Sequence, residues 1–364
     1  MSDIPSWNHH NPVHIVCAQL DCLAQHVNAQ HVLLVTTKGF VKRGTVQRVK
    51  DILSTHQVTV WDGVKPNPDI KDLHTATASL RELNIGCVVG LGGGSALDAA
   101  KVLATTIPNP AEPSLLSVFR HKTAPEWALR LPLIAIPTTA GTGAEATPFA
   151  TIWDHEKNKK HSLAGDFVYP NVALLDATLT LSLNEDDTLY PALDALSHAL
   201  ESLWNKNRSQ ISRLYAYKAI KLWNKAFPKI RQNPGNQSIR NDLMIASTLA
   251  GIAISQTQTA IAHAISYNLT LKYGIPHGLA CSFTLPFLIE QNIENITVDE
   301  LELSEIVQAK NILASLDFEA MLSNFATKNQ IFSTYLDIEK NTRLLNYMKS
   351  DKCRVEEILK SSLE

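Results

Sequence analysis

The residues best suited to chemistry in this chain are one aspartate and three histidines in apolar surroundings. Asp194 and His198 stand four residues apart in "ALDALSHALE", a spacing that puts both side chains on one helix face. His263 lies within the apolar run "TAIAHAIS", and His277 follows a Gly-Ile-Pro break at an expected helix start. Each histidine alone is most simply explained as a buried core residue. Together, one carboxylate and three imidazoles make a complete tetrahedral ligand set for a divalent metal ion.

The identity of the metal is left open by these ligand types. They suit Fe(II), Zn(II) or another first-row divalent ion, which would act as a Lewis acid on a carbonyl or alcohol oxygen. Glu201 shares the face of Asp194 one helical turn further on. We expect Glu201 to support a ligand or cap a helix rather than to bind the metal.

A glycine cluster follows an expected strand in "VVGLGGGSALDAAKVLA". Gly93 and Gly94 would let backbone amides approach a ligand, and the helix N-terminus after them favours an anion such as a pyrophosphate. We expect Ser95 to cap this helix, with Asp98 three residues later as in a capping box. Because Ser95 replaces the third glycine of the G-x-G-x-x-G pattern, a simple tight turn explains the segment equally well.

A second small-residue loop, "PTTAGTGAEATP", follows another expected strand. It carries the hydroxyl groups of Thr138, Thr139 and Thr142. In open α/β sheets, ligands bind at the carboxyl ends of the strands. Two such loops in one sheet favour a dinucleotide over a single phosphate.

The two halves of the chain differ in their hydrophobic pattern. Before about residue 180, apolar runs alternate with amphipathic segments, which predicts a buried parallel sheet. The expected strands span 31–37, 57–64, 85–93, 131–139 and 171–177, with a polar hairpin at 150–164. After about residue 185, including the tail from Thr297, the pattern is helical. We therefore predict a Rossmann-like α/β domain over residues 1–183 and an all-helical domain over residues 184–364.

The composition is that of a globular protein. The chain has 364 residues, of which 45% are hydrophobic and 19% charged, with a net charge of -2. It offers no basic field for nucleic acid or an anionic membrane, and we find no signal peptide or membrane span in it. Its five cysteines are scattered and form no disulfide or zinc pattern. These features predict a reduced, cytoplasmic protein that acts on a small molecule.

Five motifs occur in a fixed order: "DGVKPNP" (62–68), "GGGSALDAAK" (92–101), "PTTAGTGAE" (137–145), "LDALSHALE" (193–201) and "YGIPHG" (273–278). With them, the chain resembles the iron-containing (group III) alcohol dehydrogenase family over nearly its whole length. The resemblance implies a dehydroquinate synthase-like architecture, with an active site in the cleft between the two domains, and commonly a homodimer. It also implies that Asp194, His198, His263 and His277 hold the metal and that NADH or NADPH is the cofactor.

The same resemblance assigns cofactor-binding residues. Asn67 would lie near the adenosine; Gly93, Gly94, Ser95 and Asp98 would hold the pyrophosphate; Thr138, Thr139, Thr142 and Phe149 would lie toward the nicotinamide; and Lys160 would reach the cofactor from the hairpin. The implied reaction is reduction of an aldehyde to a primary alcohol, and its reverse. A metal polarises the substrate oxygen, and the reduced nicotinamide supplies hydride.

The chain departs from the family pattern at positions that affect proton transfer and cofactor choice. Tyr267 stands where many relatives carry a histidine often assigned to proton relay; a phenol has an ordinary pKa of about 10, against about 6.5 for histidine. Tyr267 would therefore relay the proton or only shape the site. Thr37 stands where NAD-preferring relatives tend to have aspartate, with Lys38 and Arg43 nearby. We therefore predict that NADPH is accepted.

The substrate prediction comes from a narrower resemblance. The stretch around Phe149 and the segment "HAISYNLTLKYGIPHGLACSF" look most like the phosphonoacetaldehyde reductase branch of the family. This implies reduction of phosphonoacetaldehyde to 2-hydroxyethylphosphonate, with Arg208 as a candidate partner for the anion, although a solvated loop arginine is the simpler explanation. Three alternatives remain: a general alcohol dehydrogenase or aldehyde reductase, a dehydroquinate synthase-like lyase, and a non-catalytic nucleotide-binding sensor. The apolar flanks of His263 and His277 disfavour the lyase.

Overall fold

The computed structural model describes residues 9–125, 127–157, 159–296, 299–349 and 354–363. The chain divides into two compact units. Asn11–Thr139 and Ala144–Thr180 form the α/β unit, and the chain from Leu181 onward forms the helical unit together with Ala140–Gly143 and the segment that ends at His10. The metal-ligand candidates belong to the helical unit, and most of the predicted cofactor residues belong to the α/β unit.

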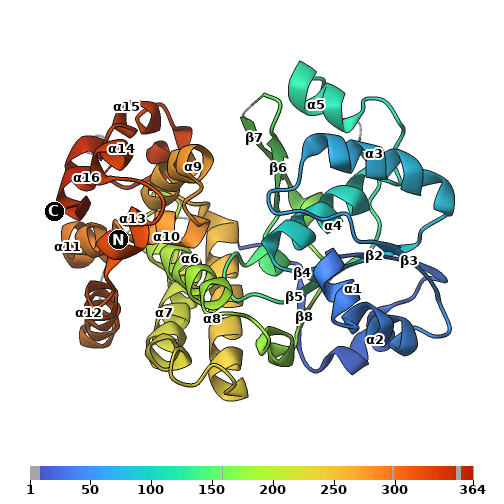
Figure 1. The fold of residues 1–364 in the computed structure, drawn as a ribbon, viewed down its shortest axis with the longest axis horizontal. Coiled ribbons are helices and arrows are strands. Elements are labelled where there is room, and N and C mark those ends of the chain that lie inside the picture. Colours follow the sequence, from blue (N-terminus) through green and yellow to red (C-terminus); the bar gives the residue numbers. More distant parts are fainter. Residues whose placement is uncertain (1–8, 126, 158, 297–298, 350–353, 364) are drawn as a thin grey trace, which may run out of the picture. The chain divides into compact units, whose positions relative to one another are not determined.

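The α/β unit is built on one parallel sheet with the strand order β1-β8-β5-β4-β2-β3 (Figure 1). Its strands are β1 (His14–Cys17), β2 (His31–Val35), β3 (Gln57–Trp61), β4 (Cys87–Gly92), β5 (Leu133–Pro137) and β8 (Val172–Leu175). Five of the six lie within the ranges expected from the sequence, and β1 is an addition. The register places Val88 opposite both Leu33 and Leu133. The prediction of a buried parallel sheet is therefore confirmed.

Both faces of this sheet are covered, which explains its uninterrupted apolar runs. Leu33 and Val35 pack into one hydrophobic core, and the alternate residues Val32 and Leu34 pack into another. The covering helices are α1 (Lys38–Lys42), α2 (Thr45–Ile52), α3 (Ile70–Leu80) and α4 (Gly94–Thr106), and α5 (Leu115–His121) packs against α3. Short 3₁₀ turns span Leu20–His26, Arg81–Leu83, Ala144–Ala146, Asp166–Val168 and Ala177–Thr180.

The polar hairpin expected at 150–164 is present as antiparallel strands β6 (Phe149–Asp154) and β7 (Lys159–Ala164). An arginine from α5 secures it: Arg120 donates from Nε and Nη2 to the two carboxylate oxygens of Asp154, each over 2.7 Å. This paired geometry holds the Arg120 guanidinium in a fixed orientation.

The start of α4 corrects one prediction from the sequence. The helix begins at Gly94 with Gly93 at the N-cap position, and no side chain caps it. Ser95 lies inside the helix, where its Oγ accepts a hydrogen bond from the Asn67 amide over 3.3 Å. Asp98 accepts from the amide of Thr151 over 2.9 Å instead of closing a capping box. The two side chains therefore connect α4 to the loop at Asn67 and to strand β6 rather than capping the helix.

The helical unit begins with three long helices that pack side by side (Figure 1). They are α6 (Asp186–Leu203), α7 (Gln210–Ile230) and α8 (Gln237–Thr257). The helices after them are α9 (Ile261–Tyr273), α10 (His277–Ser282), α11 (Leu285–Ile296), α12 (Glu300–Ala314), α13 (Phe318–Ser323), α14 (Lys328–Phe332), α15 (Tyr335–Ile338) and α16 (Val355–Leu363), with a 3₁₀ turn, η6, at Thr342–Asn346. One hydrophobic core runs through them, from Leu189 to Leu359.

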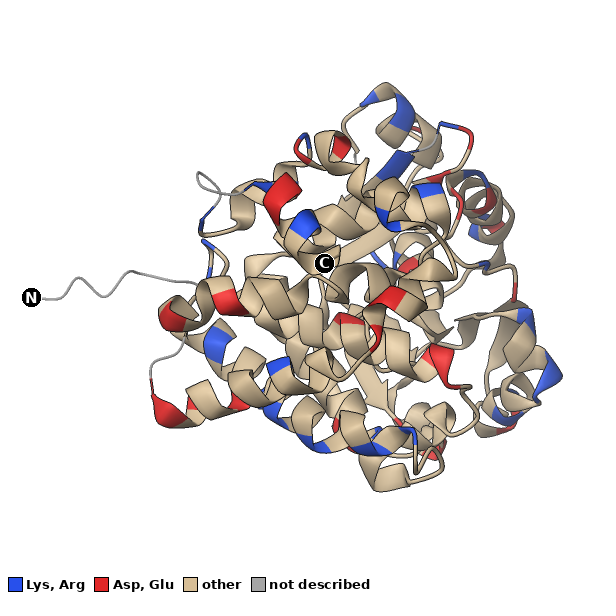
Figure 2. Cartoon of the chain, turned by 60° about the vertical axis from the view of Figure 1, so that its left-hand side comes forward, with Lys and Arg blue, Asp and Glu red and all other residues tan. Residues whose placement is uncertain are grey.

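Basic and acidic residues are interspersed along the helices in Figure 2. None of the helices among the described residues is long and apolar enough to cross a membrane. Four cysteines, Cys17, Cys22, Cys87 and Cys281, are present as free thiols. Cys353 lies outside the described residues.

Candidate metal centre and nucleotide-binding residues

Helix α6 presents Asp194 and His198 on one buried face, as the spacing of four residues predicts. Side chains from two other helices fix this part of α6. Trp223 donates from Nε1 to the Ala192 carbonyl over 2.7 Å, and Ser282 donates from Oγ to the Leu193 carbonyl over 3.1 Å. The backbone directly before Asp194 is therefore held by α7 and α10.

The three predicted histidine ligands converge on one carboxylate oxygen. The Nε2 atoms of His263, His198 and His277 lie 3.3, 3.7 and 3.8 Å from Oδ1 of Asp194. Ligand atoms that share one tetrahedral ion at bond lengths of about 2.0–2.1 Å are separated by about 3.3–3.4 Å. The three separations from Oδ1 of Asp194 are close to this value, which is compatible with a divalent ion that Asp194 shares with the histidines.

Two of the candidate ligand atoms that face this point are buried and have no hydrogen-bond partner among the described residues. They are Oδ1 of Asp194 and Nε2 of His263, the two atoms closest to each other in the set. Buried polar atoms in proteins are normally paired, because an unpaired one loses its hydration without compensation. A cation between these two atoms would satisfy both.

Glu201 is not directed at this point but supports it. Its Oε2 lies 2.6 Å from Nδ1 of His263, which leaves Nε2 of that ring free for a metal. Its carboxylate also accepts hydrogen bonds from the amides of Ala260, Ala262 and His263 over 3.0, 2.6 and 3.3 Å. These amides stand at the N-terminus of α9, where backbone groups lack partners within the helix. Glu201 thus caps α9 and orients its histidine, the role expected from the sequence.

The charge distribution favours anionic aspartate and a neutral His198. Burial raises the pKa of Asp194, but His198, His277 and His263 outweigh burial and hold that pKa well below its usual range. Burial lowers the pKa of His198 to about 4, so its ring is uncharged at pH 7 and can offer a nitrogen lone pair to a metal. Burial also opposes the charged form of His263, but Cys281 and Glu201 outweigh burial and raise its pKa above the ordinary value.

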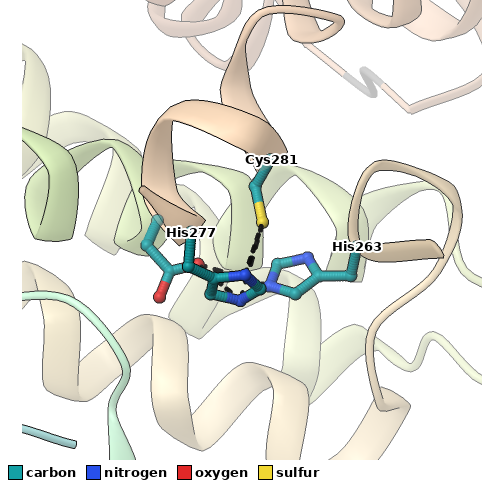
Figure 3. Close-up of side chains that lie close together, drawn as sticks. His263, His277 and Cys281 are labelled. Carbon is teal, nitrogen blue, oxygen red and sulfur yellow. Dashed lines mark hydrogen bonds and ion pairs between the residues drawn. The ribbon is translucent and has the colours of Figure 1, made fainter. Parts of the chain in front are cut away.

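Cys281 is a further potential metal ligand, in addition to the four residues predicted from the sequence. Its sulfur lies 3.8 Å from Nδ1 and 3.7 Å from Nε2 of His277 (Figure 3), so it stands beside the ring rather than in line with one nitrogen. Asp194, His263, His277 and Cys281 form a second, overlapping set of four potential ligands. Burial raises the pKa of the Cys281 thiol, which disfavours the thiolate that a metal requires. Cys281 follows His277 by four residues on α10, so the spacing in the sequence already indicates that the two side chains share a helix face.

The exposed side of the centre is formed by His277 and Tyr267. The His277 side chain is 35% exposed, against 2% for His263 and 5% for His198. The Tyr267 ring stacks nearly parallel to the His277 ring, with centroids 5.9 Å apart. A substrate approaching from solvent would therefore meet these two rings first.

The predicted nucleotide-binding residues gather at the carboxyl edge of the sheet. The chain passes from β2 to β3 on one side of β2 and then to β4 on the other, a change of direction at which open α/β sheets bind ligands. Gly93 and Gly94 follow β4 there, and Thr138 and Thr139 follow β5. A Cβ atom at Gly93 would lie 3.2 Å from Oγ1 of Thr139, so the two loops are close together.

Several predicted cofactor residues contact one another. Asn67 adopts a left-handed backbone with φ of 59° and contacts Ser95, while Asp98 holds the β6 residue Thr151. The Lys160 ammonium lies 5.5 Å from the ring centroid of Trp153 on the hairpin. Phe149 begins β6, and Thr142 falls in the segment grouped with the helical unit.

Family models match both parts of the chain. The model "Iron-containing alcohol dehydrogenase" matches residues 13–177, and "Fe-containing alcohol dehydrogenase family, C-terminal" matches residues 188–363. The chain therefore belongs to the iron-containing alcohol dehydrogenase family.

Three individual proteins are similar to this chain in sequence or in structure. A probable alcohol dehydrogenase of Escherichia coli is 37% identical over 65% of this chain and 58% of its own length, so this match leaves much of the relative uncovered. The phosphonoacetaldehyde reductase of Streptomyces viridochromogenes is 35% identical over 72% of this chain and 67% of its own length. The crystal structure of sulfoacetaldehyde reductase from Bifidobacterium kashiwanohense in complex with NAD+ is 28% identical, covers 99% of both chains and superposes with a TM-score of 0.87.

Proposed function

We propose that this protein catalyses the metal-dependent, NAD(P)H-linked reduction of a small aldehyde to a primary alcohol, and the reverse reaction. The observation that carries this proposal is the convergence of three imidazole Nε2 atoms on Oδ1 of Asp194. Membership of the iron-containing alcohol dehydrogenase family supports it. A non-catalytic nucleotide-binding sensor would have no need of this buried set of four ligands.

In the proposed reaction, each of the chain's own groups has a limited task. A divalent ion, iron or zinc, would supply Lewis acidity, and the reduced nicotinamide would supply hydride. Asp194 brings negative charge to the centre, and Glu201 holds His263 so that its Nε2 faces Asp194. His277 and Tyr267 line the exposed side, where Tyr267 orients the substrate or passes a proton through its phenol oxygen.

Substitution of Asp194 tests the ligand set. Asp194→Ala removes the oxygen that all three histidines face, so we expect loss of bound metal and of aldehyde reduction, with nucleotide binding retained. Metal content by elemental analysis, aldehyde-dependent loss of reduced-nicotinamide absorbance, and nucleotide titration measure the three properties.

Two further variants decide between the overlapping ligand sets. If His198 completes the site, His198→Ala loses the metal and Cys281→Ser retains it; the opposite pattern would assign the site to the cysteine set. Retention of both metal and activity in Asp194→Ala would contradict the proposal.

We infer that NADPH is accepted as well as NADH. No carboxylate stands at Thr37 to repel a ribose 2′-phosphate, and the Arg43 guanidinium lies 4.3 Å above the Phe40 ring on α1. Arg43 is exposed and forms no ion pair with a described residue, so it is available to a phosphate.

Kinetics with both nucleotides test this inference. Arg43→Gln should lower the ratio of kcat/KM for NADPH to that for NADH by about tenfold, the loss expected for one charge-assisted hydrogen bond. Arg48→Gln, at an exposed arginine on α2 that pairs with Asp21, is the matched control and should leave the ratio unchanged. A strong NADH preference in the wild-type protein would contradict the inference.

The finer substrate proposal is phosphonoacetaldehyde, converted to 2-hydroxyethylphosphonate. Two relatives carry names of reductases for aldehydes with an anionic group, phosphonoacetaldehyde and sulfoacetaldehyde. The alternative is a general aldehyde reductase, which the probable alcohol dehydrogenase of Escherichia coli exemplifies. Equal turnover of phosphonoacetaldehyde and propanal would favour the general enzyme.

We also propose that the protein is a cytoplasmic homodimer. Scattered free cysteines favour a reducing compartment, and the family resemblance favours the dimer. Light scattering of the purified protein would measure the dimer, and a monomeric mass would contradict it.

A further inference from the structure

Arg343 lies beside Tyr267, one of the two residues on the exposed side of the metal centre. The Arg343 guanidinium carbon is 5.3 Å from the centroid of the Tyr267 ring, and this ring stacks on His277. Arg343 belongs to η6, far from α9 and α10 in the sequence but packed against α9 in the fold. A series of contacts thus connects the guanidinium, through the Tyr267 ring, to the candidate ligand His277.

The backbone and side chain of Arg343 are held in place by hydrogen bonds. Its Nη1 donates to Oγ1 of the buried Thr259 over 2.6 Å. Its amide donates to Oδ1 of Asn341 over 3.0 Å, and Asn346 at the other end of η6 donates to the Thr259 carbonyl over 2.8 Å. A cation anchored in this way keeps its direction, which lowers the entropy cost of binding a ligand.

The charge of Arg343 has no counter-charge in the described part of the chain. None of the ion pairs formed by the described residues involves Arg343, and the group it bonds, Thr259, is a neutral hydroxyl. A guanidinium carries five N–H donors in a planar fork, and the bond to Thr259 uses one of them. The remaining donors can bind two oxygens of a phosphonate or sulfonate at once.

Arg208, the cation suggested by the sequence, is less well suited to this task. Its Nη1 donates to the carbonyl of Asn205, three residues before it, over 3.3 Å. Burial lowers the pKa of Arg208, and the like charge of Arg213 lowers it further.

We propose that Arg343 binds the anionic group of the substrate and thereby selects aldehydes that bear a tetrahedral oxyanion on the carbon next to the carbonyl group. This inference rests on the proposed function, because it assigns a substrate class to the same centre. The guanidinium would act on binding and orientation only, with no bond made or broken at Arg343. A phosphonate and a sulfonate could both be the anionic group that Arg343 binds, so an aldehyde of each kind serves as a test substrate.

The kinetic test compares phosphonoacetaldehyde and sulfoacetaldehyde with neutral propanal. Arg343→Met keeps an unbranched stem that can cover Tyr267 but removes the charge. We expect kcat/KM for the two anionic aldehydes to fall about 10- to 100-fold more than kcat/KM for propanal, mainly through KM. Arg343→Lys should restore part of the difference, and the control Arg208→Gln should keep the wild-type substrate ratio.

A binding measurement makes the inference testable apart from turnover. Calorimetric titration with 2-hydroxyethylphosphonate should show weaker binding to metal-loaded Arg343→Met than to the wild-type protein. Equal binding, or an equal kinetic loss on all three aldehydes, would overturn the role of Arg343 while leaving aldehyde reduction intact. If the wild-type protein reduces none of the aldehydes, the proposed function fails, and the titration still decides whether Arg343 binds the anion.

Discussion

At the scale of single residues, Glu201 links backbone structure to the metal centre. Its carboxylate accepts three amides at the start of α9 and also contacts Nδ1 of His263. Glu201 is fully buried, and burial alone would raise its pKa. His263 and the hydrogen bonds from the amides outweigh burial and hold that pKa below the ordinary value, so the carboxylate stays negatively charged. The same hydrogen bonds therefore place the helix and set the tautomer of the histidine on it.

Glu201→Gln should weaken metal binding by about 10- to 100-fold, the usual effect of removing a group that orients a metal-bound histidine. The neutral amide keeps the shape but offers only one acceptor oxygen to the four donors now present. Competition with a chromophoric chelator measures the affinity. Glu290→Gln, which alters an exposed pair with Lys310, is the control and should match the wild type. Unchanged affinity in Glu201→Gln would show that His263 is oriented by other contacts.

At the scale of elements, α10 approaches α6 so closely that only glycine fits at residue 278. A Cβ atom there would lie 1.7 Å from the Tyr190 carbonyl oxygen and 3.2 Å from the Asp194 amide nitrogen, both in the α6 backbone. This contact stands next to His277, so the distance between the two helices also sets the distance between two candidate ligands.

Gly278→Ala should therefore separate α6 from α10 and disrupt the metal centre. Overpacking typically costs about 1–3 kcal/mol, and here the obstacle is backbone rather than a movable side chain. Thermal denaturation should show a lower midpoint and elemental analysis a lower metal content. Gly235→Ala is the matched control, since a Cβ atom at that position meets nothing within 4 Å. If Gly278→Ala binds metal like the wild type, α10 can shift without affecting its ligand.

At the scale of the whole molecule, the two units carry different sets of candidate binding residues. The candidate metal ligands all lie in the helical unit, whereas Asn67, Ser95 and Asp98 all lie in the α/β unit. Each unit has hydrophobic core clusters built from its own residues. Because of this division, we expect a bound metal ion and a bound nucleotide to stabilise different parts of the chain.

Scanning calorimetry should thus show two transitions that respond separately. A ligand at 100 times its Kd stabilises the part that binds it by about 2.7 kcal/mol. Added metal should raise the transition of the helical unit, and added nucleotide should raise that of the α/β unit. Asp194→Ala should lose only the response to metal. A single transition raised by either ligand would show that the two units unfold together.

The sequence by itself determined the features that depend on local periodicity. Continuous apolar runs between helices specify a sheet buried on both faces, and spacing by four specifies that Asp194 and His198 share a helix face. The Gly-Ile-Pro break before His277 likewise specifies a new helix, because proline cannot continue the preceding one. The motifs around these residues were enough to indicate the family.

The tertiary structure decided which distant segments meet. Glu201 caps a helix from another part of the chain, and Arg343 reaches Tyr267 from the tail. Ser95 bonds to the loop at Asn67 and Asp98 to strand β6 instead of capping α4. The short strand β1 forms because β8 offers it a paired edge. Periodicity sets the face of a helix or strand on which a side chain lies. The partner of that side chain depends on how distant segments pack together, and no local sequence pattern encodes this packing.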